Sequence, residues 1–206
     1  MTSTYGNPEA NTVLIQMVDD HDLEGIESEV AEIRKLTDAD FYLIAIKVQD
    51  WNSDLSPWTA PAVFGKEGFG AGAGNTLADV LKHTEDKSKT YYIGGYSLAA
   101  LFALWAAYQT DVFKGVAAAS PSMWFPDFVA YMKDRHICTD SVYLSLGDRE
   151  EKARNPVMAT VGDRIWEAYA VLKQQGVNTI LEWNQGNHFM EADIRTAKAF
   201  AWIMEA

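Results

Sequence analysis

The sequence predicts an α/β fold in which helices cover both faces of a largely parallel sheet. Short apolar runs bounded by glycine, proline or polar residues alternate with segments of helical periodicity, which is typical of parallel strands joined by helices. The composition supports a sizeable core, because 48% of the 206 residues are hydrophobic and 12% are aromatic. We expect one domain, residues 1–206, since no repeat or low-complexity linker divides the chain.

Strands and helices are expected to alternate along the whole chain. Six apolar runs that end at breakers or polar residues are the expected strands: Thr12–Val18, Phe41–Val48, Thr90–Gly95, Gly115–Ala119, Ser141–Leu146 and Thr179–Trp183. Six segments with helical spacing are the expected helices: Leu23–Leu36, Thr76–His83, Leu98–Gln109, Phe125–Lys133, Val157–Gln175 and Ala192–Met204.

A candidate nucleophile lies where the third of these strands gives way to a helix. The strand breaks at Gly94 and Gly95, and a helix is expected immediately after Ser97. On such a turn a serine hydroxyl stands clear of the backbone, beside the free N–H groups of the helix start. The segment Gly95–Ala99 keeps the first glycine of the G-x-S-x-G nucleophile elbow and replaces the last with alanine, which is small enough for the site. A serine at a helix start is also a common N-cap, so Ser97 requires partners.

A histidine partner is expected after the last strand. His188 lies in a loop of glycine and asparagine between the final strand and the final helix, where its ring can swing towards the serine. His83 and His136 lie in polar surroundings and are expected to be solvated. His21 stands among aspartates, which suits a capped helix start better than a metal site, because no second histidine completes such a site.

The acid is expected after the strand that ends at Gly147. Three carboxylates follow this glycine: Asp148, Glu150 and Glu151. Glu150 is the expected partner, because three residues beyond the glycine gives the reach to the far nitrogen of the histidine. Asp148 remains an alternative, Glu151 is expected to face water, and the whole cluster also suits a helix cap.

With these residues in place, the chain resembles a small α/β-hydrolase of the esterase family that includes esterase D, enterochelin esterases and feruloyl esterases. Serine, acid and histidine follow one another in the order found along α/β-hydrolase chains. The resemblance covers most of the length and rests on four segments: Gly94–Leu104, Ala118–Phe125, Leu146–Glu150 and Gly186–His188. It implies a three-layer fold with Ser97 as nucleophile, His188 as general base and then acid, and a carboxylate after Gly147 orienting the histidine.

The resemblance implies a serine esterase that cleaves a small or aromatic ester through an acyl-enzyme, with no cofactor and no metal. The Ser120–Trp124 segment would line its pocket. An aromatic pocket wall is expected from four residues, each of which also suits the core: Trp51, Trp58, Trp124 and Phe125. A non-catalytic binding protein on the same fold and an acyltransferase that uses the same triad remain alternatives.

The chain departs from the family pattern at two places. It begins almost at the third strand of the full fold, so we expect the leading antiparallel strands to be absent and the sheet to be reduced to about six strands. The family's His-Gly, which precedes one oxyanion donor, is replaced by Val18–His21. We expect the backbone N–H of Leu98 and that of Asp20, or of Asp19, to hold the oxyanion, provided that the nearby carboxylates point away.

The long irregular stretch Gln49–Asn75 is expected to lie over the active site, because loops of this length are usually functional or mobile. Its segment Gly68–Ala73 fits the G-x-G-x-x-A loop of dinucleotide-binding proteins. In dinucleotide-binding proteins this pattern directly follows the first strand, and an acidic residue stands at the end of the next strand. Here the next strand ends in Ile93–Gly95, which contains no acidic residue. A nucleotide site is therefore not expected.

Charge and composition narrow the partners. The formal net charge of −12 disfavours nucleic acid and anionic membranes and suits a neutral or cationic small molecule. No apolar run approaches the roughly 20 residues of a membrane span, and Met1–Ala10 lacks the features of a secretory signal, so we expect a cytoplasmic protein. The single cysteine, Cys138, has no partner for a disulfide or a metal site. The edge of the reduced sheet is a candidate homodimer contact.

Overall fold

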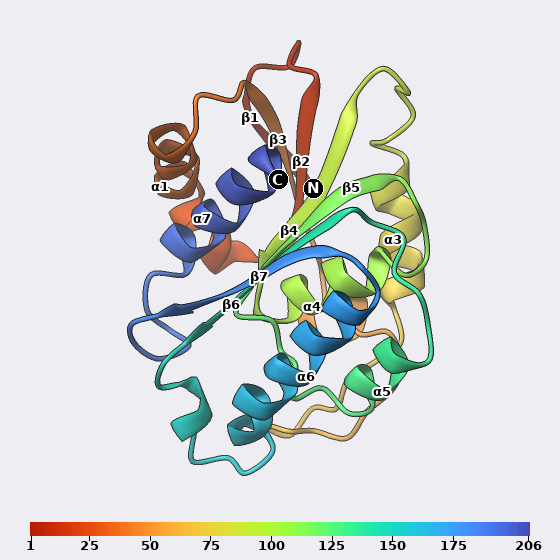
Figure 1. The fold of residues 1–206 in the computed structure, drawn as a ribbon, viewed down its shortest axis with the longest axis vertical. Coiled ribbons are helices and arrows are strands. Elements are labelled where there is room, and N and C mark those ends of the chain that lie inside the picture. Colours follow the sequence, from red (N-terminus) through yellow and green to blue (C-terminus); the bar gives the residue numbers. More distant parts are fainter.

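The structure, a computed structural model, describes residues 1–206 and contains a seven-stranded sheet with helices on both faces (Figure 1). The strands are β1 (Thr2–Gly6), β2 (Thr12–Val18), β3 (Phe41–Lys47), β4 (Thr90–Tyr96), β5 (Phe113–Ala119), β6 (Ser141–Gly147) and β7 (Asn178–Asn184). The helices are α1 (Asp20–Leu36), α2 (Trp51–Asp54), α3 (Ala73–Leu81), α4 (Ser97–Ala106), α5 (Phe128–Lys133), α6 (Val161–Gln174) and α7 (Ala192–Glu205), with short 3₁₀ turns at Glu150–Lys152 and Met158–Thr160. All predicted strands and helices are present, with ends displaced by up to four residues.

The sheet order creates a switch point in the middle of the sheet. The strands lie in the order β1-β3-β2-β4-β5-β6-β7, and all neighbours are parallel except β1 and β3. The chain runs outward from β2 to β3 and then crosses to β4 on the other side of β2. In open α/β sheets ligands bind where the strand order reverses in this way, at the carboxyl ends of the strands. Here that place is the adjoining ends of β2 and β4, which lead into α1 and α4.

The sequence analysis predicted a sheet of about six strands and missed one strand of the structure, β1. This strand pairs antiparallel with β3, from Thr2 opposite Ile46 to Gly6 opposite Tyr42. It is an edge strand with only exposed or half-buried residues, so it needs no apolar run, and its single large apolar side chain, Tyr5, gave no periodic signal. The expectation that the leading antiparallel strands are all absent was therefore wrong for this one.

Helices α1 and α7 cover one face of the sheet, and α3, α4, α5 and α6 cover the other (Figure 1). The two faces bury separate clusters of 17 and 41 residues, so the larger core lies on the α4 side. Every residue of α4 except Ser97 and Trp105 is buried. The turn that carries Ser97 is thus held by the most deeply buried helix of the fold. No helix combines the length and the apolar character needed to cross a membrane.

The segment between β3 and α3 is less irregular than expected. It contains α2 and a bridge between Ala60 and Phe69. A side-chain carbon at Gly70 or Gly72 would collide with Ser53, so these glycines allow close packing against α2. The glycines of Gly68–Ala73, the segment that fits the sequence pattern of a dinucleotide loop, therefore have a packing role.

Candidate active site

Ser97 occupies a strained turn between β4 and α4. Its φ of 58° lies in the left-handed region, which serines seldom adopt outside constrained sites. Gly95, two residues earlier, has a φ of 152°, and a side-chain carbon there would lie 2.9 Å from the Cβ of Ala99. The elbow therefore tolerates alanine at its last position because Gly95 carries no side chain.

The structure brings Ser97, His188 and Glu150 into one chain of hydrogen bonds. Ser97 Oγ lies 2.9 Å from His188 Nε2, and His188 Nδ1 lies 2.7 Å from Glu150 Oε2. The Ser122 hydroxyl lies 3.3 Å from Ser97 Oγ, and its backbone N–H donates to the Ser97 carbonyl over 3.1 Å. A nucleophile within hydrogen-bond reach of a base, itself oriented by a third group, is the arrangement that activates a serine.

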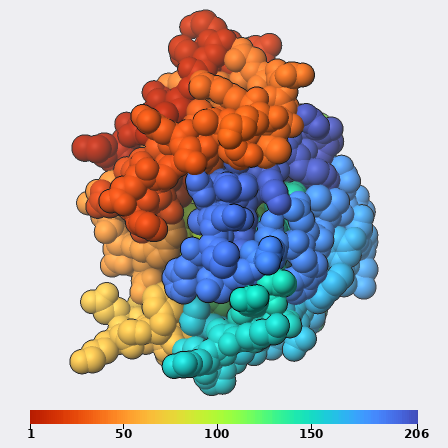
Figure 2. Space-filling model, turned by 90° about the vertical axis from the view of Figure 1, so that its left-hand side faces the viewer, coloured from red at the N-terminus to blue at the C-terminus, as the bar shows by residue number.

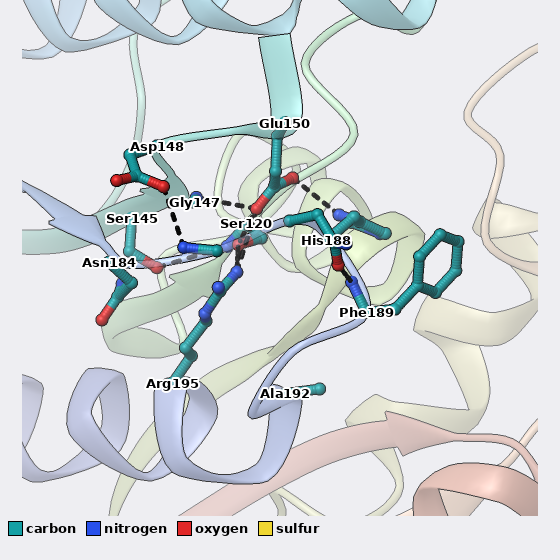
Figure 3. A network of polar contacts seen from close by, with 12 residues as sticks. Ser120, Ser145, Gly147, Asp148, Glu150, Asn184, His188, Phe189, Ala192 and Arg195 are labelled. Atoms are coloured by element: carbon teal, nitrogen blue, oxygen red, sulfur yellow. Dashed lines mark hydrogen bonds and ion pairs between the residues drawn. The ribbon is translucent and has the colours of Figure 1, made fainter. Parts of the chain in front are cut away.

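The Glu150 carboxylate is buried, and its second oxygen is fully engaged. Oε1 accepts hydrogen bonds from the Gly147 N–H over 2.7 Å, from the Ser120 hydroxyl over 2.8 Å and from Arg195 Nη1 over 3.1 Å (Figure 3). The Glu150 side chain is only 4% exposed. A charge this deep is tolerated when it is paired and hydrogen-bonded. The carboxylate is therefore fixed with one oxygen facing the histidine ring.

Arg195 is a member of this hydrogen-bond network that the sequence analysis missed. Its side chain, 1% exposed, reaches from α7 to Glu150 and also donates to Tyr96 Oη and to the Gln185 carbonyl, both over 3.0 Å. The Tyr96 hydroxyl in turn donates to the His188 carbonyl over 2.8 Å. Burial, reinforced by the nearby Glu150 charge, raises the pKa of Tyr96 to about 12, so its phenol stays protonated and can donate. Arg195 and Tyr96 together hold the histidine loop against the acid.

The other two candidate acids do not reach the histidine. Asp148 is exposed, and its Oδ1 accepts a hydrogen bond from the Gly186 N–H over 2.8 Å. It thus fixes the loop that carries His188, at a glycine with a φ of 108°. Glu151 is exposed, as expected. The geometry selects Glu150 as the partner of the histidine.

The expected oxyanion donors lie at the starts of two helices. Leu98 is in the first turn of α4 and Asp20 in the first turn of α1, where N–H groups have no acceptor within the helix. The Asp19 N–H is already used, because it donates to Asp22 Oδ2 over 3.1 Å in a capping box, so Asp20 is the better candidate. The Asp20 carboxylate is exposed and pairs with Lys47 over 2.5 Å, which turns its charge outward.

His21 follows this cap at the start of α1, as predicted. It is exposed and lies 3.7 Å from Glu24 one turn further along the helix. No group of three or more histidine, cysteine, aspartate or glutamate side chains is arranged to hold a metal ion.

A cavity of about 190 Å³ adjoins His188. Trp124 lines it, together with Pro121, Met158 and Val161, and Arg149 and Lys152 stand in its wall. Of the four aromatic residues expected to form a pocket wall, the structure brings only Trp124 there. The Gln49–Asn75 segment approaches this place through Phe64 and Phe69, which pack on Trp124, but none of its residues lines the cavity.

The other three expected pocket residues pack away from the cavity beside His188. Trp58 donates from its indole N–H to the Pro126 carbonyl over 3.1 Å, and its ring packs against Phe125 and the aromatic side of α5. Phe125 is buried, and Trp51 is half-buried against the larger core. None of the three lines the cavity beside His188; Trp58 and Phe125 pack against other aromatic rings instead.

Comparison with known proteins shows similarity at the level of structure. No protein-family profile matches the sequence, and no curated protein resembles it in sequence. An IroE-like serine hydrolase from Shewanella oneidensis has a TM-score of 0.77 at 14% identity, over 98% of this chain and 74% of the other. The siderophore hydrolase EstA from Aspergillus nidulans has a TM-score of 0.66 at 21% identity, over 97% and 84% of the two chains.

A third solved structure leads to the same assignment. The enterobactin esterase FES from Shigella flexneri has a TM-score of 0.67 at 13% identity, over 99% of this chain and 55% of the other. Identities this low concern the fold alone, and the expected resemblance is confirmed at that level. The sheet order, the serine elbow and these similarities together show that the chain has the α/β-hydrolase fold of esterase structures.

Proposed function

We propose that the protein is a serine esterase that cleaves a small or aromatic ester through an acyl-enzyme. The observation that carries the proposal is the continuous chain from Ser97 Oγ through the His188 ring to Glu150, with distances of 2.9 and 2.7 Å. The names of the structurally similar proteins, which include an enterobactin esterase and a siderophore hydrolase, support an ester substrate. No cofactor is needed for this chemistry.

In the proposed mechanism Ser97 Oγ attacks the ester carbonyl carbon while His188 Nε2 takes its proton. Glu150 stabilises the imidazolium ion that forms, and the N–H groups of Leu98 and Asp20 hold the oxyanion. His188 then gives the proton to the leaving alcohol as the tetrahedral intermediate collapses to the acyl-enzyme. Water attacks this ester with His188 as base, and a second tetrahedral intermediate releases the acid and restores the Ser97 hydroxyl.

The cavity beside His188 suits a modest acyl or alcohol group. Its volume of about 190 Å³ lies below the range of typical drug-sized pockets. Trp124, Met158 and Val161 give it an apolar wall. We expect short acyl and aryl esters to be better substrates than long-chain esters.

Two features would have favoured a non-catalytic binding protein: Glu150 turned from the histidine, or aspartate carboxylates filling the oxyanion site. Instead Glu150 contacts His188 and the Asp20 carboxylate pairs with Lys47, which supports the enzyme over the binding protein. An acyltransferase would use the same groups, and analysis of products formed with and without added alcohol distinguishes it from an esterase.

Labelling with a fluorophosphonate probe, followed by peptide mapping, tests the proposal. The expected result is an adduct on Ser97, abolished in Ser97→Ala and in heat-denatured protein and retained in Ser88→Ala, which removes an exposed serine elsewhere. In a triad enzyme the loss of the nucleophile costs on the order of 10⁶ in turnover. Near-normal ester hydrolysis by Ser97→Ala, or no adduct on the folded protein near neutral pH, would end the proposal.

A further inference from the structure

A second cavity, of about 380 Å³, lies between α1 and α7 at the same edge of the sheet as Ser97. Gln16 on β2 and Tyr96 on β4 contribute to its lining. Figure 2 shows this face of the molecule, where α1 (orange) and the start of α7 (blue) adjoin. Its remaining charged and titratable lining residues are one histidine and five carboxylates: His21, Asp22, Glu24, Glu29, Glu191 and Asp193. The cavity is therefore strongly acidic, with no lysine or arginine in its wall.

Two residues that line this cavity each carry a buried oxygen atom without a hydrogen-bond partner. Gln16 Nε2 donates to Glu29 Oε2 over 3.3 Å, which leaves Gln16 Oε1 and Glu29 Oε1 unpaired. The two residues are 3% and 4% exposed. A buried polar atom without a partner costs about 1–3 kcal/mol, more when it is charged. A cation nearby favours the ionised carboxylate of Glu29, and both atoms are then acceptors only, so the group that would complete them is a cationic donor.

No lysine or arginine of the cavity wall pairs with Glu29, Asp22 or Asp193. Burial raises the pKa of Glu29 to about 8, against the lowering effect of the Gln16 hydrogen bond, and the charges of Asp22 and Asp193 raise it further. Burial raises the pKa of Asp22 to about 6. A bound cation would favour the ionised form of both groups, so the missing donor is expected to carry a positive charge.

The size and arrangement of the cavity favour an organic cation over a metal ion. No three of its acidic or histidine side chains converge as metal ligands. Its volume of about 380 Å³ is roughly thirteen times the 30 Å³ that one water occupies in the liquid. A primary ammonium group at the end of a short chain matches a cavity of this volume and supplies the N–H donors that the two unpaired acceptors lack.

The second cavity is next to the reacting groups. Phe189 lines both this cavity and the one beside His188, and its ring centroid lies 5.6 Å from that of His188. Tyr96, which also lines the acidic cavity, immediately precedes Ser97 and has its ring centroid 5.1 Å from that of His188. A substrate that crosses Phe189 would have its ester at Ser97 and its far end among the carboxylates.

We propose that the cavity between α1 and α7 binds the primary ammonium group of an amino-substituted ester substrate, through Glu29 with Gln16, Asp22 and Asp193. The proposal rests on the esterase function and specifies the substrate class of that site. The N–H donors of a primary ammonium group complete Gln16 Oε1 and Glu29 Oε1, and its charge offsets the carboxylates. A quaternary ammonium group has no N–H and cannot do the first of these.

The kinetic test compares pairs of esters of equal chain length that end in a primary ammonium or in a neutral hydroxyl group, placed on the acyl part in one series and on the alcohol part in the other. We expect kcat/KM to favour the ammonium ester about tenfold or more in at least one series, as a charged hydrogen bond provides. Glu29→Gln and Asp193→Asn should lose this preference, which is measured as a ratio within each variant and so is independent of any change in its overall activity. Glu27→Gln, which removes one charge from the exposed side of the same helix, should retain it.

Equal kcat/KM values within every pair would overturn the proposal. So would a preference that survives in Glu29→Gln and Asp193→Asn, because it would then arise from the overall net charge of −12. A trimethylammonium ester preferred as strongly as the primary ammonium ester would show that the unpaired acceptors do not bind the ligand.

A binding measurement separates this proposal from the esterase function. Titration of Ser97→Ala with butylammonium ion, followed by chemical shift changes near α1 and α7, needs no catalysis. Suppose that butylammonium binds, that adding Glu29→Gln to the Ser97→Ala protein abolishes the binding, and that the wild-type protein hydrolyses no ester. This result would support the ammonium site and refute the esterase. Hydrolysis of neutral esters without any binding of butylammonium would support the esterase and overturn the ammonium site.

Discussion

Replacing Arg195 with methionine removes the cation that pairs with the buried Glu150 and leaves the three triad residues themselves unchanged. Arg195 and Glu150 are 1% and 4% exposed at their side chains and lie 3.1 Å apart. Breaking a buried ion pair by removing one partner costs about 3–5 kcal/mol, because the other charge stays buried. In a chain of this size 1 kcal/mol corresponds to roughly 2–4 °C in Tm. We therefore expect Arg195→Met to lower Tm by about 10 °C.

The kinetic effect should fall on kcat. Arg195 does not line the cavity beside His188, so KM should change little. A freer Glu150 and a freer histidine loop would orient the His188 ring less well, and kcat should fall by about tenfold or more. Arg195→Lys keeps the charge and should recover part of both Tm and kcat, which a role in packing alone would not predict.

Lys198→Met is the matched control on the same helix. Lys198 pairs with Glu182 over 2.9 Å, but both side chains are more than one-third exposed, so its loss should cost about 1 kcal/mol or less. Thermal unfolding followed by tryptophan fluorescence, together with hydrolysis of a short aryl ester, measures all of these variants. Equal Tm values for Arg195→Met and Lys198→Met, with kcat unchanged in both, would refute the role assigned to Arg195.

Three further predictions concern the acid, a buried carboxyl group and the elbow. Glu150→Gln should lower kcat on the order of 10⁴, whereas Asp148→Asn should lower it far less, as steady-state kinetics can show. The pKa of Glu29 is raised from an ordinary 4.5 to about 8, so its contribution to folding stability is fully present below about pH 4.5 and is lost as pH rises through 8. Urea unfolding at about pH 5 and about pH 9 should show this loss in the wild type and not in Glu29→Gln. Gly95→Ala should destabilise the protein by about 1–3 kcal/mol, because its side chain would meet Ala99; an unchanged urea midpoint would contradict this.

The elements of the fold were predictable where periodicity reports burial. Six strands and six helices follow from apolar runs and helical spacing, because their side chains enter the two cores. Strand β1 was not predicted because it is an edge strand, which pairs on one side only and leaves its side chains exposed or half-buried. The elbow and the loop that carries His188 were predictable because each lies at a strand end marked by glycine.

The burial of two charged residues, Arg195 and Glu29, was not predicted, although the sequence carried a signal for both. Arg195 shares a helix face with Ala199 and Ile203, which are one and two turns further along α7 and are buried. Glu29 lies on the same face of α1 as Ile26 and Ile33. A charged residue on the apolar face of a helix must have a partner or a function, so this pattern would have indicated both positions. Trp124 lines the cavity beside His188, whereas Trp51, Trp58 and Phe125 do not. This difference depends on tertiary packing, which the spacing of residues along the sequence does not reveal.

Helix α7 places side chains of opposite charge beside two buried glutamates, Glu150 and Glu29. α7 places Arg195 against Glu150, which is thereby paired within the protein, and places Asp193 beside Glu29, which adds repulsion. Both arrangements lie within one turn of helix, so the fold can supply a cation at this depth. The absence of a protein cation at Glu29, beside two unpaired acceptor atoms, is therefore the arrangement expected where a ligand brings the charge. Since Phe189 borders both this site and the cavity of His188, binding there and hydrolysis at Ser97 should be linked through one substrate.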